Sequence, residues 1–123
     1  MANVSNEYVS GVLNMAYDAE NERVELACNL KPNDPETVQM YRLGTVIREG
    51  SRVYAFSNTG LTTNTEDASG GRWTASSYAG NVLASDQDRT FNGLVQGRVF
   101  QDGESEDFTF GISLKIEASA LAT

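Results

Sequence analysis

The stretch Phe108-Thr-Phe-Gly-Ile-Ser-Leu-Lys-Ile116 decides the fold class of this chain. Apolar side chains occupy every second position from Phe108 to Ile116, and the positions between them are Thr, Gly, Ser and Lys. Because successive side chains of a β-strand point to opposite faces, this alternation predicts a strand with one buried and one solvated face. Residues 94–100 predict a second strand, and the polar link 101–107 between the two predicts an antiparallel hairpin.

A second hairpin is predicted near the start of the chain. Residues 9–17 and 23–30 form its strands, and the polar segment 18–22 joins them. In the second strand Val24, Leu26, Cys28 and Leu30 alternate with Arg23, Glu25, Ala27 and Asn29. This pattern places Cys28 on the apolar face, where a thiol is buried and unreactive.

The centre of the chain begins with a break at residues 31–36, which contain both prolines. One alternative is a short helix that Asp34-Pro35 would cap and that continues through Met40, with Gly44 closing it. We favour a strand over residues 41–47, because its spacing has period two and it ends in three consecutive β-branched residues. A turn at 49–51 then leads into a partner strand at 52–57.

Residues 61–72 contain almost no large apolar side chain, so we expect an exposed polar loop there. A weaker strand pattern follows from Trp73 to Leu83. The two terminal segments, 1–7 and 117–123, are short and are candidate extended arms that dock on a partner. The whole chain, 1–123, is predicted to be a single, mainly β domain: a small antiparallel β-sandwich or open β-barrel.

Composition excludes several kinds of chemistry. The chain has 123 residues, with 9 Lys and Arg against 17 Asp and Glu, so its formal net charge is −8, and it has no His. Without His, neither a Ser-His-Asp nor a Cys-His catalytic arrangement can form. A single Cys allows no internal disulfide and no cysteine-rich zinc site. We therefore expect no catalytic residues, no cofactor and no enzymatic activity.

The acidic balance also argues against nucleic acid as a partner, because phosphate backbones are bound by clustered Lys and Arg. Here the nine basic residues are dispersed along the sequence. The apolar runs are far shorter than the roughly 20 residues that a membrane helix needs. The first basic residue is Arg23, so the N-terminal segment does not match a signal peptide. We expect a protein made in a cytoplasm that binds no membrane.

Acidic clusters are the candidates for metal or hydrolytic chemistry. The cluster 102–107 and the pair Asp86 and Asp88 carry oxygen ligands of the kind that calcium prefers, but neither has the EF-hand spacing. Both are better interpreted as solvated turns. Seventeen carboxylates also make a glycosidase-like pair inevitable somewhere, so such a pair carries no signal. We predict no metal site.

Aromatic side chains on alternating strands are the best candidates for an interaction surface. They are suited either to a sugar-binding platform or to packing in a core or between subunits. The candidate interface residues are Tyr8, Tyr41, Tyr54, Phe56, Trp73 and Tyr78.

Three short patterns resemble the small capsid decoration, or cement, proteins of tailed phages. They are the strand 41–47 with its Leu-Gly-Thr core, the aromatic strand 53–60 that follows Gly50, and the hairpin 13–24. Together they cover about a third of the chain, and the half after Leu61 has no such counterpart. The patterns are short β motifs of low specificity.

The resemblance implies a non-enzymatic β domain that binds the outside of an assembled head shell and strengthens it. Its partners would be the major capsid protein or other virion subunits, and it would form a homo-oligomer, with a trimer favoured. It would be located at the capsid surface after synthesis in a host cytoplasm. The alternative is a carbohydrate-binding β-sandwich, for which Trp73, Tyr78 and the polar segment 62–64 are the candidate features.

Overall fold

The computed structural model describes residues 2–34, 37–60, 73–83 and 86–118, and the side chains of 39–41 and 57–60 lie outside that description. The described residues form eight β-strands. These are β1 (Ala2–Ser5), β2 (Val9–Asp18), β3 (Arg23–Pro32), β4 (Val38–Glu49), β5 (Arg52–Gly60), β6 (Trp73–Ala79), β7 (Arg89–Gln101) and β8 (Glu104–Ile116).

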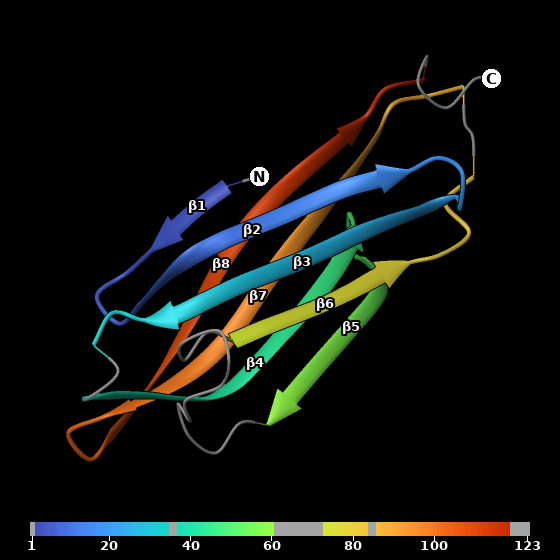
Figure 1. Cartoon of the computed structure of the whole chain (residues 1–123). Coiled ribbons are helices and arrows are strands. Elements are labelled where there is room, and N and C mark those ends of the chain that lie inside the picture. Colours follow the sequence, from blue (N-terminus) through green and yellow to red (C-terminus); the bar gives the residue numbers. More distant parts are fainter. Residues whose placement is uncertain (1, 35–36, 61–72, 84–85, 119–123) are drawn as a thin grey trace.

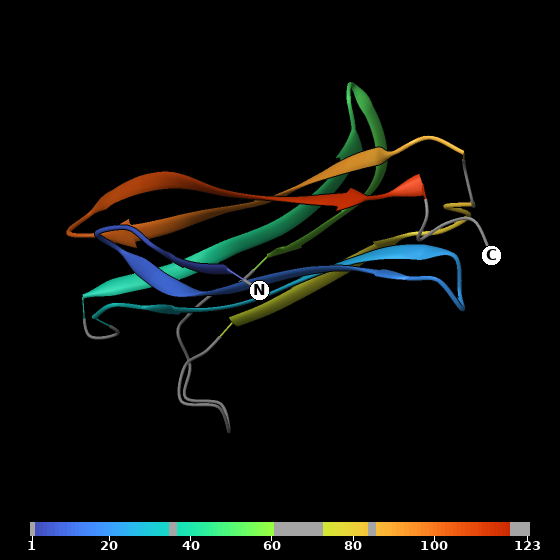
Figure 2. The same cartoon turned by 90° about the horizontal axis from the view of Figure 1, so that it is seen from above.

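The strands make two antiparallel sheets that lie face to face, as the two layers in Figure 2 show. The first sheet has the order β1-β2-β3-β6 and the second has the order β5-β4-β7-β8 (Figure 1). Leaving the short β1 aside, three strands oppose four, which is an immunoglobulin-like division. The predicted mainly β fold is confirmed, and of the two architectures expected it is the sandwich that forms.

The β7–β8 hairpin follows the predicted alternation. Its register runs without interruption from Arg89 opposite Ile116 to Gln101 opposite Glu104. The loop is only Asp102-Gly103, and both residues have positive φ, 52° and 80°. An Asp-Gly pair supports this tight turn because both residues tolerate the left-handed region. The strands therefore extend through most of the acidic stretch that the sequence pattern assigned to a polar link.

The first hairpin is also confirmed, with Val9 opposite Pro32 and Asp18 opposite Arg23. Cys28 is buried on its inner face, and burial raises the pKa of the thiol. Residues 38–49 form β4, so the strand prevails over the helix considered for this region. Glycine allows the tight β4–β5 turn, since Gly50 has a φ of 59°.

Two hydrophobic clusters fill the space between the sheets. One contains Leu13, Leu30, Leu43 and Phe108, and the other surrounds the fully buried Phe91. Thr45 is the buried polar side chain among the described residues, and its hydroxyl donates a hydrogen bond of 2.9 Å to Ser77 Oγ. This bond joins β4 to β6 and so ties one sheet to the other.

The terminal segments differ from each other. Residues 2–5 form β1, which pairs with β2 as an edge strand rather than standing apart as an arm. The apolar side chain of Val4 explains this, because it packs against the first core cluster. At the other end, the backbone N–H of Ala118 donates a hydrogen bond to Asp88 Oδ1 at 2.9 Å. The expected polar loop 61–72 and the last five residues of the C-terminal arm lie outside the described residues.

Candidate functional site

The six aromatic residues predicted for an interface do not form one surface. Tyr8 and Trp73 are partly buried and pack against the first core cluster. Tyr78 is 60% exposed and lies on the outer face of β6, opposite in direction to Trp73. Because these two side chains point to opposite faces of one strand, they cannot make the common sugar platform that the sequence indicated. The side chain of Tyr41 lies outside the described residues.

Tyr54 is directed toward the core by a β-bulge. The register between β4 and β5 shifts at Ile47/Arg48, so Ala55 pairs with Ile47 and Val53 pairs with Arg48. Tyr54 is the extra residue, and both Tyr54 and Ala55 then pack against the second core cluster. Bulges commonly re-aim a side chain in this way. A simple alternation pattern cannot detect one.

A polar network holds the Tyr54 hydroxyl. Arg89 donates to both carboxylate oxygens of Glu49, from Nε at 2.9 Å and from Nη2 at 2.8 Å. The Tyr54 hydroxyl donates to Glu49 Oε1 at 3.0 Å and accepts from Arg89 Nη2 at 3.1 Å. The hydrogen bonds from Arg89 are the chief reason that the pKa of Glu49 lies below its ordinary value. The network joins the end of β4 to the start of β7 and to the bulged Tyr54 of β5.

We expect Glu49→Gln to lower the free energy of unfolding by about 1–3 kcal/mol at pH 7, because Arg89 loses a charged, bidentate acceptor. A carboxylate whose folded pKa is depressed stabilises the fold above its unfolded pKa and loses that effect as the pH falls through the folded pKa. The gap between wild type and Glu49→Gln should therefore shrink below the ordinary value near 4.5. Urea unfolding at pH 7 and pH 3 measures both values.

The control for this prediction is Glu25→Gln. Glu25 pairs with Arg23 at 2.7 Å, but both side chains are substantially exposed, so its removal should have little effect. If the two variants lose the same stability at pH 7, the Arg89 network has no special role.

Phe56 and Tyr78 flank an open groove at the side of the sandwich where β5 and β6 lie next to each other (Figure 1). The groove has a volume of about 470 Å³, and Tyr54, Ala55, Ser76 and Ser77 line the rest of it. Phe56 is 75% exposed. Arg23 covers one face of the Tyr78 ring at 4.8 Å, so a single face of that ring remains for a ligand. Three of the predicted interface aromatics, Tyr54, Phe56 and Tyr78, therefore line this groove.

The outer face of the second sheet carries an apolar row that crosses three strands. Phe56 of β5 pairs with Val46 of β4, and Val46 pairs with Leu94 of β7. The row ends at Gly111 of β8, which lies opposite Leu94. Val53, which is 52% exposed, extends the row, because it lines the same hollow as Val46 and Phe56. We call Val46, Val53, Phe56 and Leu94 the apolar row.

Two adjacent apolar pairs in the sequence indicate this row. Val46-Ile47 and Leu94-Val95 are adjacent apolar pairs within strands. Since neighbouring residues of a strand face opposite ways, such a pair places one apolar side chain in the core and one outside. Ile47 and Val95 are the buried members, and Val46 and Leu94 are the outer ones.

Arginines border the apolar row. A hollow of about 750 Å³ on this face is lined by Val46, Val53 and Phe56 together with Arg42, Arg98 and Asp107. Arg98 donates to Asp107, and this is the main reason that the pKa of Asp107 is lowered. Arg42 lowers that pKa further through its charge. The charged residues that line this hollow are thus two arginines and one carboxylate, in a chain whose formal net charge is −8.

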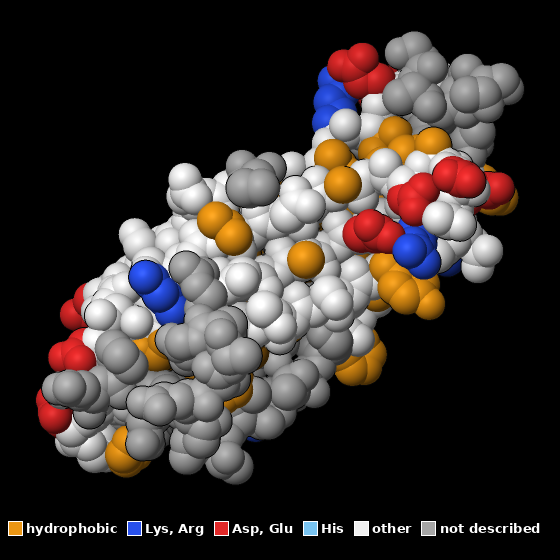
Figure 3. All heavy atoms as spheres, in the orientation of Figure 1, with side chains coloured by type: hydrophobic (Ala, Val, Ile, Leu, Met, Phe, Trp, Pro, Cys, Tyr) orange, Lys and Arg blue, Asp and Glu red, His pale blue; other side chains and the backbone are white. Residues whose placement is uncertain are grey.

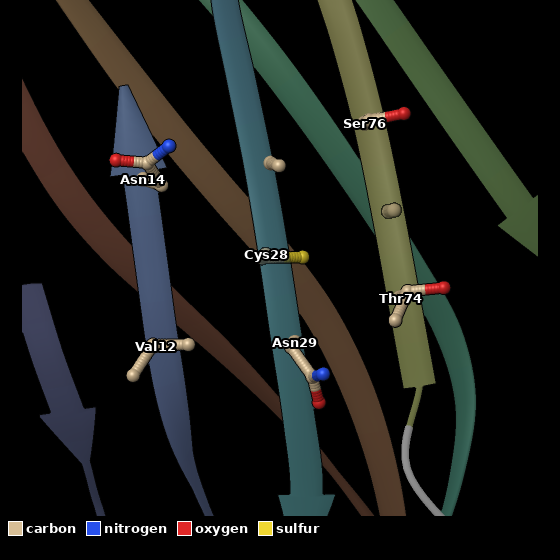
Figure 4. Close-up of a pocket in the computed structure, with 8 residues that line it drawn as sticks. Val12, Asn14, Cys28, Asn29, Thr74 and Ser76 are labelled. Atoms are coloured by element: carbon tan, nitrogen blue, oxygen red, sulfur yellow. The ribbon is translucent and has the colours of Figure 1, made fainter. Parts of the chain in front are cut away.

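The outer face of the first sheet has a different character. Figure 3 shows it with charged side chains toward the ends of the strands and uncharged ones across the middle. A shallow depression there is lined by Val12, Asn14, Asn29, Thr74 and Ser76, which Figure 4 shows on β2, β3 and β6. Its lining offers amide and hydroxyl groups but no aromatic ring, so it lacks a surface on which a sugar could stack.

Within the described residues, no three His, Cys, Asp or Glu side chains gather in a way that could hold a metal ion. The same part of the chain contains no helix with the length and apolar character required to cross a membrane.

No protein-family model and no curated protein matches this sequence. Solved structures with a similar fold include the ApaA protein from Bordetella pertussis, with 15% identity, coverage of 86% of this chain and 89% of that chain, and a TM-score of 0.47. Another is the β-glucuronidase of Parabacteroides merdae, with 13% identity, a TM-score of 0.51, and coverage of 89% of this chain but 14% of the enzyme. A third is β-glucosidase 3B of Thermotoga neapolitana, with 14% identity, a TM-score of 0.37, and coverage of 89% and 16%. At these identities the similarity concerns the fold alone, which is a β-sandwich.

Proposed function

We propose that this chain is a non-enzymatic binding module that docks on a protein subunit of a larger assembly through the outer face of its second sheet. The observation that carries the proposal is the apolar row on that face, in which Val53 and Phe56 are exposed and Val46 and Leu94 are partly exposed. The more specific version of this proposal is the capsid decoration role that the sequence resemblance implies. In that form the partner is the outer surface of an assembled phage head shell.

The energetics of the row favour a partner. Contiguous exposed apolar side chains mark interaction sites in soluble proteins, since each Å² of apolar surface removed from water contributes about 25 cal/mol. Phe56 is the most exposed large apolar side chain among the described residues, at 75%. An exposed aromatic side chain in an apolar patch that arginines border is the usual composition of an interface core and its rim.

Charge selects the partner surface. The chain has a formal net charge of −8, yet Arg42 and Arg98 border the apolar row. These arginines favour a partner that presents carboxylates around an apolar patch, whereas the acidic turns elsewhere on the chain repel that partner. Docking through this face is therefore favoured over docking through the loop ends. Many copies on a repeating lattice would then bind firmly even if each contact is weak.

We expect Phe56→Asp to weaken binding to undecorated head shells at least about tenfold, because it removes the most exposed ring and adds a charge of the same sign as the partner. The measurement is co-sedimentation of purified protein with shells, together with the shell melting temperature, which wild type should raise. Leu94→Asp, at the other end of the row, should act in the same way.

The matched control is Val12→Asp. Val12 is a partly exposed apolar residue on the outer face of the first sheet, so its replacement should leave shell binding unchanged. Wild-type protein that neither sediments with shells nor changes their melting temperature would overturn the capsid role. Equal losses for Phe56→Asp and Val12→Asp would overturn the choice of face.

A carbohydrate-binding module is the second candidate, and the groove between β5 and β6 favours it. Phe56 and Tyr78 offer ring surface on its two sides, and Ser76 and Ser77 offer hydroxyl groups between them. Tyr78 lines this groove and not the apolar row, and Leu94 belongs to the row and not the groove. On a glycan array, sugar binding that Tyr78→Ala removes and Leu94→Asp leaves intact would support this function. An array without hits counts against it.

A further inference from the structure

The free edge of β8 is the feature that the proposed function leaves unexplained. β8 is the last strand of the second sheet, and among the described residues no strand pairs with its outer side. It has 13 residues, no proline, and an uninterrupted register with β7. A long, regular edge strand of this kind presents unpaired backbone N–H and C=O groups to any strand that can add to it.

The other edges are shorter or obstructed. β1 has only four residues. β5 is bent by the bulge opposite Ile47/Arg48, and bulges discourage edge pairing. β6 has seven residues and lies next to β5 along the β5–β6 groove. Of the described edges, β8 alone is both long and regular.

The side chains of β8 also favour an added strand. Residues 108–114 carry no charge, although charged residues on an edge are the common protection against pairing. Phe110, Ile112 and Leu114 point inward but remain partly exposed, because no neighbouring strand covers them from the open side. A second strand with inward apolar residues would complete their burial.

We propose that the partner of this edge is a second copy of the same chain, which pairs β8 with β8 antiparallel about a two-fold axis at Gly111. The two second sheets then join into one continuous eight-stranded sheet. A two-fold interface is self-complementary, so every contact occurs twice. The arrangement uses the edge of the sheet and leaves the apolar row free.

Charge fixes the register. With the axis at Gly111, Asp107 lies opposite the partner's Lys115, four residues from the axis on each strand. An axis at Ile112 would place Asp107 opposite the partner's Glu117, and an axis at Phe110 would place it opposite the partner's Ser113. Of these three neighbouring registers, the one at Gly111 brings opposite charges together. Opposite charges directly across an antiparallel pair stabilise it, and like charges destabilise it.

The charges within one chain extend this pairing into a row. Arg98 forms an ion pair with Asp107, and Asp88 forms one with Lys115 at 3.4 Å. The side chains of Asp107, Lys115 and Asp88 are each more than half exposed, at 68%, 59% and 52%. In the dimer the order of charges becomes Arg98, Asp107, the partner's Lys115 and the partner's Asp88. Signs alternate along the whole row.

The glycine at the axis is not required by the fold of one chain. A Cβ atom on Gly111 would make only ordinary contacts, 3.7 Å from Leu94 Cδ2 and 3.9 Å from the Gly93 carbonyl oxygen. Gly97, by contrast, has the Phe108 ring in the space where its Cβ would lie. At a two-fold axis a residue faces its own copy, and glycine there allows the two backbones to approach closely.

The first test is sedimentation over a range of concentrations. Wild type should form a species of twice 13.3 kDa, and Asp107→Lys or Lys115→Glu alone should weaken it about tenfold or more, since each creates two like-charged pairs. The double variant Asp107→Lys/Lys115→Glu should recover part of the dimer, because opposite charges again face each other across the axis, while the new charges repel Arg98 and Asp88 of their own chain. Lys31→Glu, an exposed charge change away from β8, is the control and should have no effect.

The second test locates the axis by cross-linking. Gly111→Cys should oxidise to a disulfide-linked dimer, because a residue on the axis lies next to its own copy. Ser113→Cys should not, since its counterpart lies four positions away along the partner strand. Cys28 is buried and does not compete. A monomer at all concentrations, a trimer, a double variant that fails to recover, or equal cross-linking at both positions would each overturn the proposal.

Neither test depends on the proposed function. Loss of shell binding in Phe56→Asp leaves the β8 edge intact, and loss of the dimer in Lys115→Glu leaves the apolar row intact. The two hypotheses therefore succeed or fail separately.

Discussion

Phe91→Ala should lower the free energy of unfolding by about 3–5 kcal/mol, the largest single effect expected in this chain. Phe91 is fully buried in the second core cluster. Tyr54 contacts its ring edge-on, with centroids 5.5 Å apart and planes at 64°, and the Arg89 guanidinium lies 5.1 Å from its centroid. Truncation removes these contacts as well as the buried surface, and leaves a cavity that the two sheets cannot close.

This prediction is measured by urea unfolding followed by circular dichroism. A loss of that size is a large fraction of the roughly 5–15 kcal/mol that stabilises a typical domain, so the midpoint of the urea transition should fall well below that of wild type. Phe100→Ala is the matched control, because Phe100 lies on the same strand but is 40% exposed on the outer face. Similar losses at the two positions would show that the second cluster does not stabilise the fold as the packing indicates.

Gly97→Ala should also be clearly destabilising, although it adds only one methyl group. Gly97 lies opposite Phe108 on the inner face of the β7–β8 hairpin. An added Cβ would overlap the Phe108 ring and approach the Arg42 carbonyl oxygen at 2.9 Å. Overpacking of this kind costs about 1–3 kcal/mol, because the ring must leave its rotamer or the strands must separate.

A double-mutant cycle checks the cause. Gly97→Ala combined with Phe108→Leu should lose less stability than the sum of the two single variants, because the smaller side chain vacates the overlapping space. Gly80→Ala is the control, since nothing lies within 4 Å of the place where its Cβ would be. Strictly additive losses in the cycle would mean that the ring is not what excludes a side chain at residue 97.

Local patterns in the sequence predicted much of the fold. The alternation from Phe108 to Ile116 and from Val24 to Leu30 identified both hairpins, because period two is a direct consequence of strand geometry. The order of strands within each sheet was not predictable in this way. The chain passes from one sheet to the other after β3, after β5 and after β6. Which strands then become neighbours depends on packing between residues that are distant in sequence.

The candidate site was predicted only in part, for physical reasons that differ from residue to residue. Phe56 and Tyr78 are exposed, as an interface requires. A bulge turns Tyr54 inward. Trp73 points into the core because it lies on the inner face of β6, where every second side chain is directed. Val46 and Leu94, the outer members of the apolar pairs, are partly exposed and extend this surface beyond the aromatic residues.

The connectivity of the two sheets also determines when the protein can fold during synthesis. The β2–β3 and β4–β5 hairpins are local and can form as soon as their strands leave the ribosome. β4, however, is central in the second sheet, and its inner neighbour β7 begins about forty residues after β4 ends. Until β7 arrives, the inner side chains of β4 have no partner on one side. Leu43 and Ile47 are therefore exposed to aggregation until about forty further residues have been synthesised.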